Sequence, residues 1–429
     1  MNCKHFSFLF TLFFLVLSCG NSAVKNKELL FWCSNNNQEI QLCTSLKNEW
    51  NRGHPDKPIH MQPIPEGQSS EEVILAAVVG KSAPDIYANM WQGNVEMYAK
   101  AGVLIPLDTL KGFLDFIRER CDSNVIKEIT SSDGHIYQVP WKVNPIMTIY
   151  NKNLFSENNI TDLPKTYSAY LQAAQRFKDN NKNSSVPKRF GYTAVRAIWY
   201  ERLFNFYALY LAASNGASLI ENNKAVFNNK YAVEVFRFLQ KLYANDYFSR
   251  ENDVASTDPF VMQRIATKWT GPWEISYLEN IPSRKFDFNY FLPIVPDDHT
   301  GPVYTYADPK NIVIFNTCAD PQTAWDFIKT LVDKNGDLQL LEITGQLPQR
   351  KNLSSDNFYA DYFKKNPMMV QFANEIPYVK GVDNCEVIVE VLDIISQEYE
   401  ACVIYGKKTP EKAITDAESA VNVLLGKGN

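Results

Sequence analysis

The sequence predicts an α/β fold organised in two domains. Short apolar strands alternate with helical patterns along the N-terminal part of the chain, and this alternation predicts a largely parallel sheet with helices on both faces. Of the 429 residues, about 410 follow the N-terminal targeting segment described below, which is more than one hydrophobic core normally organises. Apolar residues make up 45% of the sequence and charged residues 21%, a composition typical of globular proteins.

The individual elements follow from hydrophobic spacing. Runs of apolar, β-branched and aromatic residues predict strands over 29–32, 58–64, 85–87, 136–140, 146–150, 266–270, 288–292, 303–306 and 311–315. Apolar residues at helical spacing predict helices over 38–51, 69–80, 166–178, 199–213 and 230–244. Two further helices are expected to begin at Asp320-Pro321 and Thr409-Pro410, where a capping side chain precedes a proline.

The first 19 residues predict export. Phe6–Leu17 is a mainly apolar run of signal-peptide length, shorter than the roughly 20 residues of a membrane-spanning helix. A small residue then directly precedes a cysteine, and this Ser18-Cys19 pair resembles the lipobox of bacterial lipoproteins. The resemblance implies a signal peptide over residues 1–18, lipidation of Cys19 and a polar tether over 19–27, so that acyl chains hold the protein on a membrane. An ordinary secretory signal with an incidental cysteine is the alternative.

Charge and cysteine usage exclude several function classes. A net charge of −5 argues against nucleic-acid binding, which needs a concentrated basic surface. The later cysteines lack Cys-x-x-Cys spacing, which argues against a zinc or redox site, and their disulfide pairing stays open. Cys318 follows an apolar run and is expected to be a buried free thiol. The six cysteines after the lipobox are Cys33, Cys43, Cys121, Cys318, Cys385 and Cys402.

Enzyme and metal signatures are missing from the sequence. It has no Gly-x-Ser-x-Gly, Walker or Gly-x-Gly-x-x-Gly motif. The acidic pairs Glu71-Glu72 and Asp297-Asp298 are adjacent and would not converge on one point, so we interpret them as solvated faces. The few histidines do not have metal-ligand spacing. We therefore expect a binding protein with no catalytic residues, no cofactor and no metal.

Four tryptophans suggest what is bound. Trp91, Trp141, Trp199 and Trp273 stand beside turn residues and polar side chains rather than inside apolar stripes. An indole face suits the C–H face of a pyranose ring, and neighbouring amides and carboxylates can bind its hydroxyl groups. Each of them could equally be a core residue. The tryptophans interpreted as structural, from their places in strands or on apolar helix faces, are Trp32, Trp50, Trp269 and Trp325.

Several short motifs occur in an order that resembles a known family, the extracellular solute-binding proteins of sugar ABC importers (the maltose-binding-like group). The Gly271-Pro272-Trp273 element and the turn Gly345-Gln346-Leu347-Pro348-Gln349-Arg350 are the most specific matches. The resemblance covers roughly residues 28–426. The other matching segments are 83–86, 98–108, 133–140, 149–155, 163–167 and 324–328.

This resemblance implies two α/β lobes joined by a hinge, with a ligand cleft between them. Lobe I would comprise residues 28–145 and 307–346, and lobe II residues 146–306 and 347–429. The resemblance assigns to the cleft Trp91, Gln92, Asn94, Trp141, Asn144, Trp199, Tyr200, Glu201, Trp273, Tyr306, Asp308 and Asn384. Arg350 would instead brace the interface between the lobes.

The resemblance also implies a function and partners. The protein would be a monomeric receptor in the bacterial cell envelope that binds a carbohydrate and delivers it to the permease of an ABC importer. One alternative keeps the fold but binds a polyol or a glycerophospho-compound, for which the available cations are Lys142, Arg196 and Arg202. The alternative from another class is a glycoside hydrolase that uses Glu201 and Asp308, and it requires the two carboxylates to face each other across a cleft.

Overall fold

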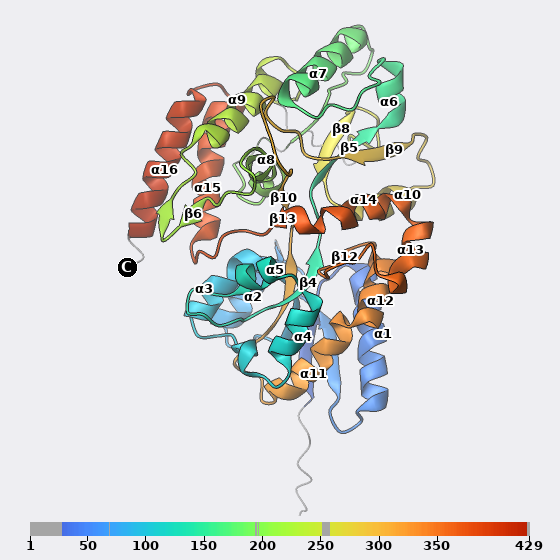
Figure 1. Cartoon of the computed structure of the whole chain (residues 1–429), viewed down its shortest axis with the longest axis vertical. Coiled ribbons are helices and arrows are strands. Elements are labelled where there is room, and N and C mark those ends of the chain that lie inside the picture. The colour runs from blue at the N-terminus through green and yellow to red at the C-terminus, as the bar shows by residue number, and fades with distance from the viewer. Residues whose placement is uncertain (1–27, 68, 194, 196, 251–257, 427–429) are drawn as a thin grey trace, which may run out of the picture.

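The computed structural model describes residues 28–67, 69–193, 195, 197–250 and 258–426. The predicted signal peptide, the lipidated Cys19 and the tether lie outside the described residues. The described chain forms two lobes, as Figure 1 shows, and this confirms the predicted two-lobe α/β fold. We call lobe I the part built on a six-stranded sheet and lobe II the part built on a three-stranded sheet.

Lobe I has the strand order β12-β4-β11-β3-β1-β2. Its strands are β1 (Leu29–Cys33), β2 (Ile59–Pro63), β3 (Ile86–Trp91), β4 (Val139–Val143), β11 (Lys310–Ile314) and β12 (Leu347–Pro348). Strands β2, β1 and β3 are parallel, but β11, β4 and β12 pair antiparallel. The predicted largely parallel sheet is therefore correct for one half only. The other half consists of segments through which the chain leaves and re-enters the lobe, so neighbouring strands run in opposite directions.

Helices cover both faces of this sheet. They are α1 (Asn37–Gly53), α2 (Ser70–Val79), α3 (Val95–Lys100), α4 (Phe113–Arg120), α5 (Ser123–Ile129), α11 (Pro321–Val332) and α12 (Lys334–Thr344), with the short turns η1 (Gln92–Asn94) and η2 (Leu107–Thr109). The predicted cap at Asp320 is confirmed, because its carboxylate accepts the Thr323 N–H at 3.0 Å. Trp325 on α11 and Trp50 on α1 lie in the core, as predicted.

Lobe II is mainly helical around the antiparallel sheet β8-β5-β9. Its strands are β5 (Met147–Asn151), β6 (Ile220–Glu221), β7 (Lys224–Ala225), β8 (Thr267–Thr270), β9 (Phe288–Phe291), β10 (Thr305–Tyr306) and β13 (Val379–Lys380). Its α-helices are α6 (Lys152–Glu157), α7 (Tyr167–Asn181), α8 (Ala208–Ala213), α9 (Lys230–Ala244), α10 (Trp273–Glu279), α13 (Ala360–Lys365), α14 (Pro367–Glu375), α15 (Ile388–Tyr399) and α16 (Pro410–Gly426). The π-helical segments η3 (Leu203–Tyr207) and η6 (Glu400–Ile404) and the 3₁₀ turns η4 (Asn357–Tyr359) and η5 (Ile376–Tyr378) complete it.

The chain crosses between the lobes three times, after β4, before β11 and after β12. Two crossings are hydrogen-bonded to each other, because Asn144 N–H donates to Ala307 O at 2.6 Å and Ile146 N–H donates to Tyr306 O at 3.0 Å. Residues 347–348, which we expected in lobe II, pair with β4 in the lobe I sheet. The other lobe boundaries stay a prediction.

Arg350 braces the third crossing against lobe I. Its Nε donates to the Asp337 carboxylate at 2.5 Å, and Arg120 binds the same carboxylate through two nitrogens at 2.6 and 2.9 Å. Arg120 and Asp337 are at most 1% exposed. The sequence predicted a role for Arg350 but gave no signal for its two partners.

Burial, membrane and metal features can be stated for the described ranges. The six later cysteines are all buried, including Cys318 as predicted. No helix within these ranges is long and apolar enough to cross a membrane. Among the same residues, no three or more potential ligands gather in a way that could hold a metal ion.

Candidate functional site

Aromatic side chains from both lobes meet between them. Trp91 ends β3 in lobe I, and its ring centroid lies 4.8 Å from that of Trp199 in lobe II. The Trp91 Nε1–H donates to the Tyr306 hydroxyl at 2.9 Å. Phe204 lies with its ring centroid 6.1 Å from those of both Trp273 and Tyr306. We call Trp91, Trp199, Phe204, Trp273 and Tyr306 the interlobe aromatic cluster; the sequence predicted four of them and missed Phe204.

Local structure explains why these residues meet. Trp91 stands at the carboxyl end of a strand, Tyr306 is the last residue of β10 before a crossing, and Trp273 begins α10 directly after Gly271-Pro272. Trp91 and Tyr306 are 2% and 0% exposed, whereas Trp199 and Trp273 are half-buried. The cluster therefore has a buried base and two partly accessible indoles, both in lobe II.

A buried polar network lies beside the cluster at the lobe I strand ends. Lys142 Nζ donates to Glu39 Oε1 at 2.7 Å and to Asn89 Oδ1 at 2.8 Å. Gln346 Nε2 donates to the same Glu39 oxygen at 2.8 Å, and its own oxygen accepts from Asn144 Nδ2 at 3.4 Å. Two buried acceptors of this network, Glu39 Oε2 and Asn144 Oδ1, have no hydrogen-bond partner in the protein.

Asn89 owes its orientation to an irregularity in β3. The register between β3 and β11 shifts from Met90–Asn311 to Ala88–Ile312, so Asn89 has no partner in the ladder. Its φ of 104° lies in a region that L-residues rarely adopt. Bulges of this kind re-aim side chains near functional sites. The sequence placed Asn89 beside Trp91 but contained no signal for the bulge.

Glu71 corrects one of the sequence predictions. We expected Glu71-Glu72 to be a solvated face, and Glu72 is exposed. Glu71 is half-buried and lines a narrow crevice that also contains Asn94 and Trp91. Burial and the nearby Glu71 carboxylate raise the pKa of Tyr98 to about 12. Asp297 and Asp298 are exposed, as predicted.

Comparison with known proteins identifies the family. Residues 49–368 match the family described as bacterial extracellular solute-binding protein. The chain belongs to this family. The resemblance predicted from the short motifs is thereby confirmed.

Relatives and solved structures of this solute-binding protein agree with that assignment. A maltotriose-binding protein of Pyrococcus abyssi is 22% identical over 84% of this chain and 73% of its own length. An sn-glycerol-3-phosphate-binding periplasmic protein of Pectobacterium atrosepticum is 21% identical over 96% of this chain and 94% of its own length. An uncharacterized Listeria monocytogenes protein superposes with a TM-score of 0.81 at 27% identity, covering 93% of this chain and 99% of that one. The cyclic alpha-maltosyl-1,6-maltose binding protein of Arthrobacter globiformis superposes with a TM-score of 0.77 at 19% identity, covering 94% of this chain and 100% of that one.

Trp141 of the solute-binding protein is a core residue, contrary to its prediction as a ligand contact. It is 0% exposed and packs in the lobe I core. All five residues of β4 are buried, because helices cover both faces of the sheet. The polar neighbour that suggested a site, Lys142, is itself buried, with Nζ 4.4 Å from the Trp141 ring centroid.

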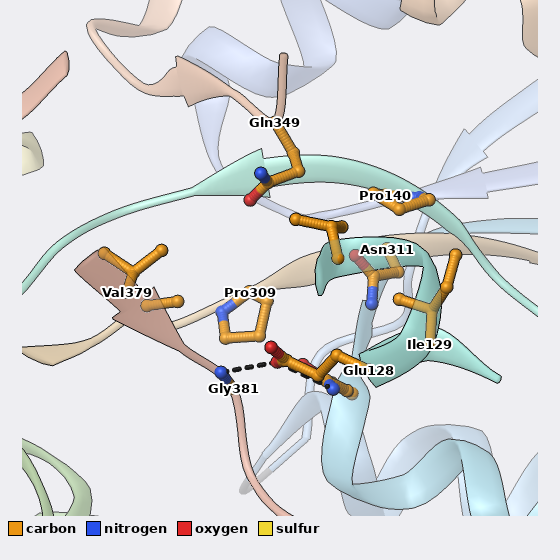
Figure 2. Close-up of a pocket in the computed structure, with 11 residues that line it drawn as sticks. Glu128, Ile129, Pro140, Pro309, Asn311, Gln349, Val379 and Gly381 are labelled. Carbon is orange, nitrogen blue, oxygen red and sulfur yellow. Dashed lines mark hydrogen bonds between the residues drawn. The ribbon is translucent and has the colours of Figure 1, made fainter. Parts of the chain in front are cut away.

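Gln92 and Asn384, which were also predicted as ligand contacts, form hydrogen bonds at the junction between the lobes. Glu128 accepts the Gly381 N–H at 2.6 Å, as Figure 2 shows. The same carboxylate accepts from Gln92 Nε2 at 3.2 Å. Burial raises the pKa of Glu128. The pocket around them holds about 20 Å³, room for roughly one water molecule. The Asn384 amide donates to the backbone oxygens of Glu128 and Thr130 at 3.0 and 2.7 Å.

The remaining predicted residues of the solute-binding protein flank the aromatic cluster. Tyr200 is exposed, and its ring centroid lies 5.6 Å from that of Trp199. Burial raises the pKa of Glu201. Asp308 adopts a φ of 37° and accepts from the Tyr306 hydroxyl at 3.4 Å, while Lys310 Nζ lies 3.6 Å from its carboxylate. Asp308 therefore orients a cluster residue.

Proposed function

We propose that this protein binds a carbohydrate, a mono- or oligosaccharide, between its lobes and delivers it to an ABC permease. The observation that carries the proposal is the convergence of five aromatic rings from both lobes at one place. Aromatic faces bury the C–H faces of sugar rings, and this stacking contributes on the order of 1 kcal/mol per ring. The similarity to a maltotriose-binding protein and to a cyclic alpha-maltosyl-1,6-maltose binding protein supports this ligand class.

The buried polar network supports a neutral sugar over a glycerophospho-compound. Glu39 Oε2 and Asn144 Oδ1 need donors, which the hydroxyl groups of a sugar supply, whereas the phosphate of a glycerophospho-compound needs free cations. The nearby cations Lys142, Lys310 and Arg350 each lie within ion-pair distance of a carboxylate of the protein. Arg202 is buried with its guanidinium 3.9 Å from the Tyr399 ring centroid. Arg196 lies outside the described residues.

Binding would proceed by closure and involve no chemical step. A sugar docks on one lobe, contacts from the other lobe complete the site, and the closed state is populated because it binds the ligand better. Closed lobes then present a surface to the permease. An acyl anchor on Cys19 would hold the monomeric receptor on the membrane that contains this permease, and would thus raise its effective concentration there.

A groove between the lobes is the competing location for the ligand. It has a volume of about 760 Å³ and includes Tyr304, Asn352, Lys380, Asp383 and Asn384. Lys380 already donates to Gly216 O at 2.8 Å, and Asp383 already accepts the N–H groups of Leu219 and Ile220. Its lining contains no tryptophan. We therefore place the sugar at the aromatic cluster.

The test is sugar binding by the folded domain and by its Trp273→Ala variant. Calorimetry with maltotriose, arabino-oligosaccharides and glycerol 3-phosphate should show binding of a neutral sugar. Trp273→Ala should weaken it by about tenfold or more, because a stacking face worth about 1.4 kcal/mol is removed. Tyr405→Ala removes an exposed lobe II aromatic away from the cluster and should leave affinity unchanged.

Two outcomes would contradict the proposal. If glycerol 3-phosphate alone binds, the ligand class is wrong. If a sugar binds equally well to Trp273→Ala but is lost in Asn384→Ala and Tyr304→Ala, the ligand occupies the 760 Å³ groove instead.

A further inference from the structure

Two indoles of the aromatic cluster fold back over a glycine two positions away. A Cβ built on Gly271 would lie 2.1 Å from Cζ3, 2.5 Å from Cη2 and 2.6 Å from Cε3 of Trp273. A Cβ built on Gly93 would lie 2.2 Å from Cη2, 2.3 Å from Cζ3 and 2.7 Å from Cζ2 of Trp91. Non-bonded carbon atoms pack at about 3.5–4.0 Å, so any side chain at either position would overlap the six-membered ring.

Space, rather than backbone conformation, requires glycine at both positions. Neither Gly93 nor Gly271 is among the residues with positive φ. An alanine would therefore adopt the same backbone without strain, and its only conflict would be with the indole. The two elements are unrelated in secondary structure, since Gly93 lies in η1 and Gly271 precedes α10. The same contact thus arises twice, on the two sides of the lobe junction.

Neighbouring contacts hold the Trp91 indole and the turn that carries Gly271. Trp91 donates to Tyr306, as described, and its other side is next to Trp199. At the second position, the Glu274 carboxylate accepts from Thr270 Oγ1 and from Lys268 Nζ, both at 3.1 Å. Glu274 is buried. This fixes the turn that carries Gly271.

We propose that Gly271 is a positioning residue, which seats Trp273 so that one ring face is closed by backbone and the opposite face is turned toward the ligand, while Gly93 seats the buried Trp91 against Trp199. The inference rests on the proposed function and extends it. The Trp273 indole would offer a single stacking face to one sugar ring. Stacking depends on ring orientation as well as ring identity, so a displaced indole loses the contact even though the tryptophan is still present.

The test uses Gly271→Ala in the otherwise intact domain, because Trp273 is half-buried and can be displaced without unfolding. We expect sugar affinity to fall about tenfold, close to the effect of Trp273→Ala. The near-ultraviolet circular dichroism should change as the indole reorients, while the far-ultraviolet spectrum stays constant. Gly53→Ala is the matched control, since nothing lies within 4 Å of a Cβ at that position, and it should leave affinity and spectra unchanged.

A ligand-independent measurement covers the case in which Gly271→Ala folds poorly. Gly271→Ala should lower Tm in the wild-type background but not in a Trp273→Leu background, because the new methyl group then no longer overlaps an indole ring. An equal decrease of Tm in both backgrounds, or wild-type sugar affinity in Gly271→Ala, would overturn the inference. Failure of the wild-type domain to bind any sugar would instead contradict the proposed function, so the two failures are distinguishable.

Discussion

At the scale of single residues, two buried acceptors of the candidate site have no hydrogen-bond partner in the protein. Most buried polar atoms in folded proteins are hydrogen-bonded, and those that are not often lie at functional sites. Glu39 Oε2 and Asn144 Oδ1 are two such atoms in one connected network. Sugar hydroxyl groups would supply the missing donors. Binding should therefore reduce the free-energy cost of burying these two acceptors.

Glu375 provides a pH-dependent prediction at the same scale. Burial raises its pKa from 4.5 to about 7. The folded state therefore holds this proton more tightly than the unfolded state, so the carboxylate destabilises the protein progressively as pH rises from 4.5 through 7. Glu375→Gln should raise Tm at pH 8 and have little effect at pH 4.5, measured by thermal unfolding.

An exposed carboxylate supplies the control for this pH dependence. Glu72→Gln should change Tm little at either pH, since Glu72 lies on an exposed helix face. Equal effects of Glu375→Gln at the two pH values would show that its carboxylate is not desolvated.

At the scale of elements, one buried carboxylate joins three segments. Asp337 on α12 binds Arg120 at the end of α4 and Arg350 just after β12. Asp337→Asn would leave two guanidinium groups without a counter-charge in the interior. We expect it to lower the free energy of unfolding by about 3–5 kcal/mol, measured by urea denaturation.

The matched control for Asp337→Asn is an exposed pair on the neighbouring helix. Asp326 and Lys329 on α11 form an ion pair at 2.8 Å with both side chains more than a third exposed. Asp326→Asn should cost less than about 1 kcal/mol. If both substitutions cost the same, the Asp337 cluster does not hold the third crossing in place.

At the scale of the whole molecule, the two lobes should close around the ligand. Small-angle X-ray scattering should show a smaller radius of gyration with saturating sugar than without it. Sugar at 100 times Kd should also stabilise the domain by about 2.7 kcal/mol. With an affinity about tenfold weaker, Trp273→Ala should be stabilised by only about 1.4 kcal/mol at the same sugar concentration. A wild-type radius that does not respond to a bound sugar would contradict closure.

Predictions from the sequence were confirmed where the local residue pattern matches the environment of those residues in the folded protein. The strand from Leu29, the cap at Asp320 and the structural role of Trp325 follow from residues close together in the chain, and the lobe architecture follows from the family motifs. The prediction of Trp141 as a ligand contact was wrong because its polar neighbour Lys142 is buried by helices from distant parts of the sequence.

The sequence by itself determined the strand–helix alternation, the export signal it predicts, the motif order of the family and most of the aromatic residues that meet between the lobes. Only the tertiary structure decided which of these residues face one another. The polar network joins Glu39, Lys142 and Gln346, which are about 100 to 300 positions apart, so no local pattern could reveal it. Only atomic distances reveal that the Trp273 ring packs directly on Gly271, because a glycine required for space looks the same in sequence as one required for backbone conformation.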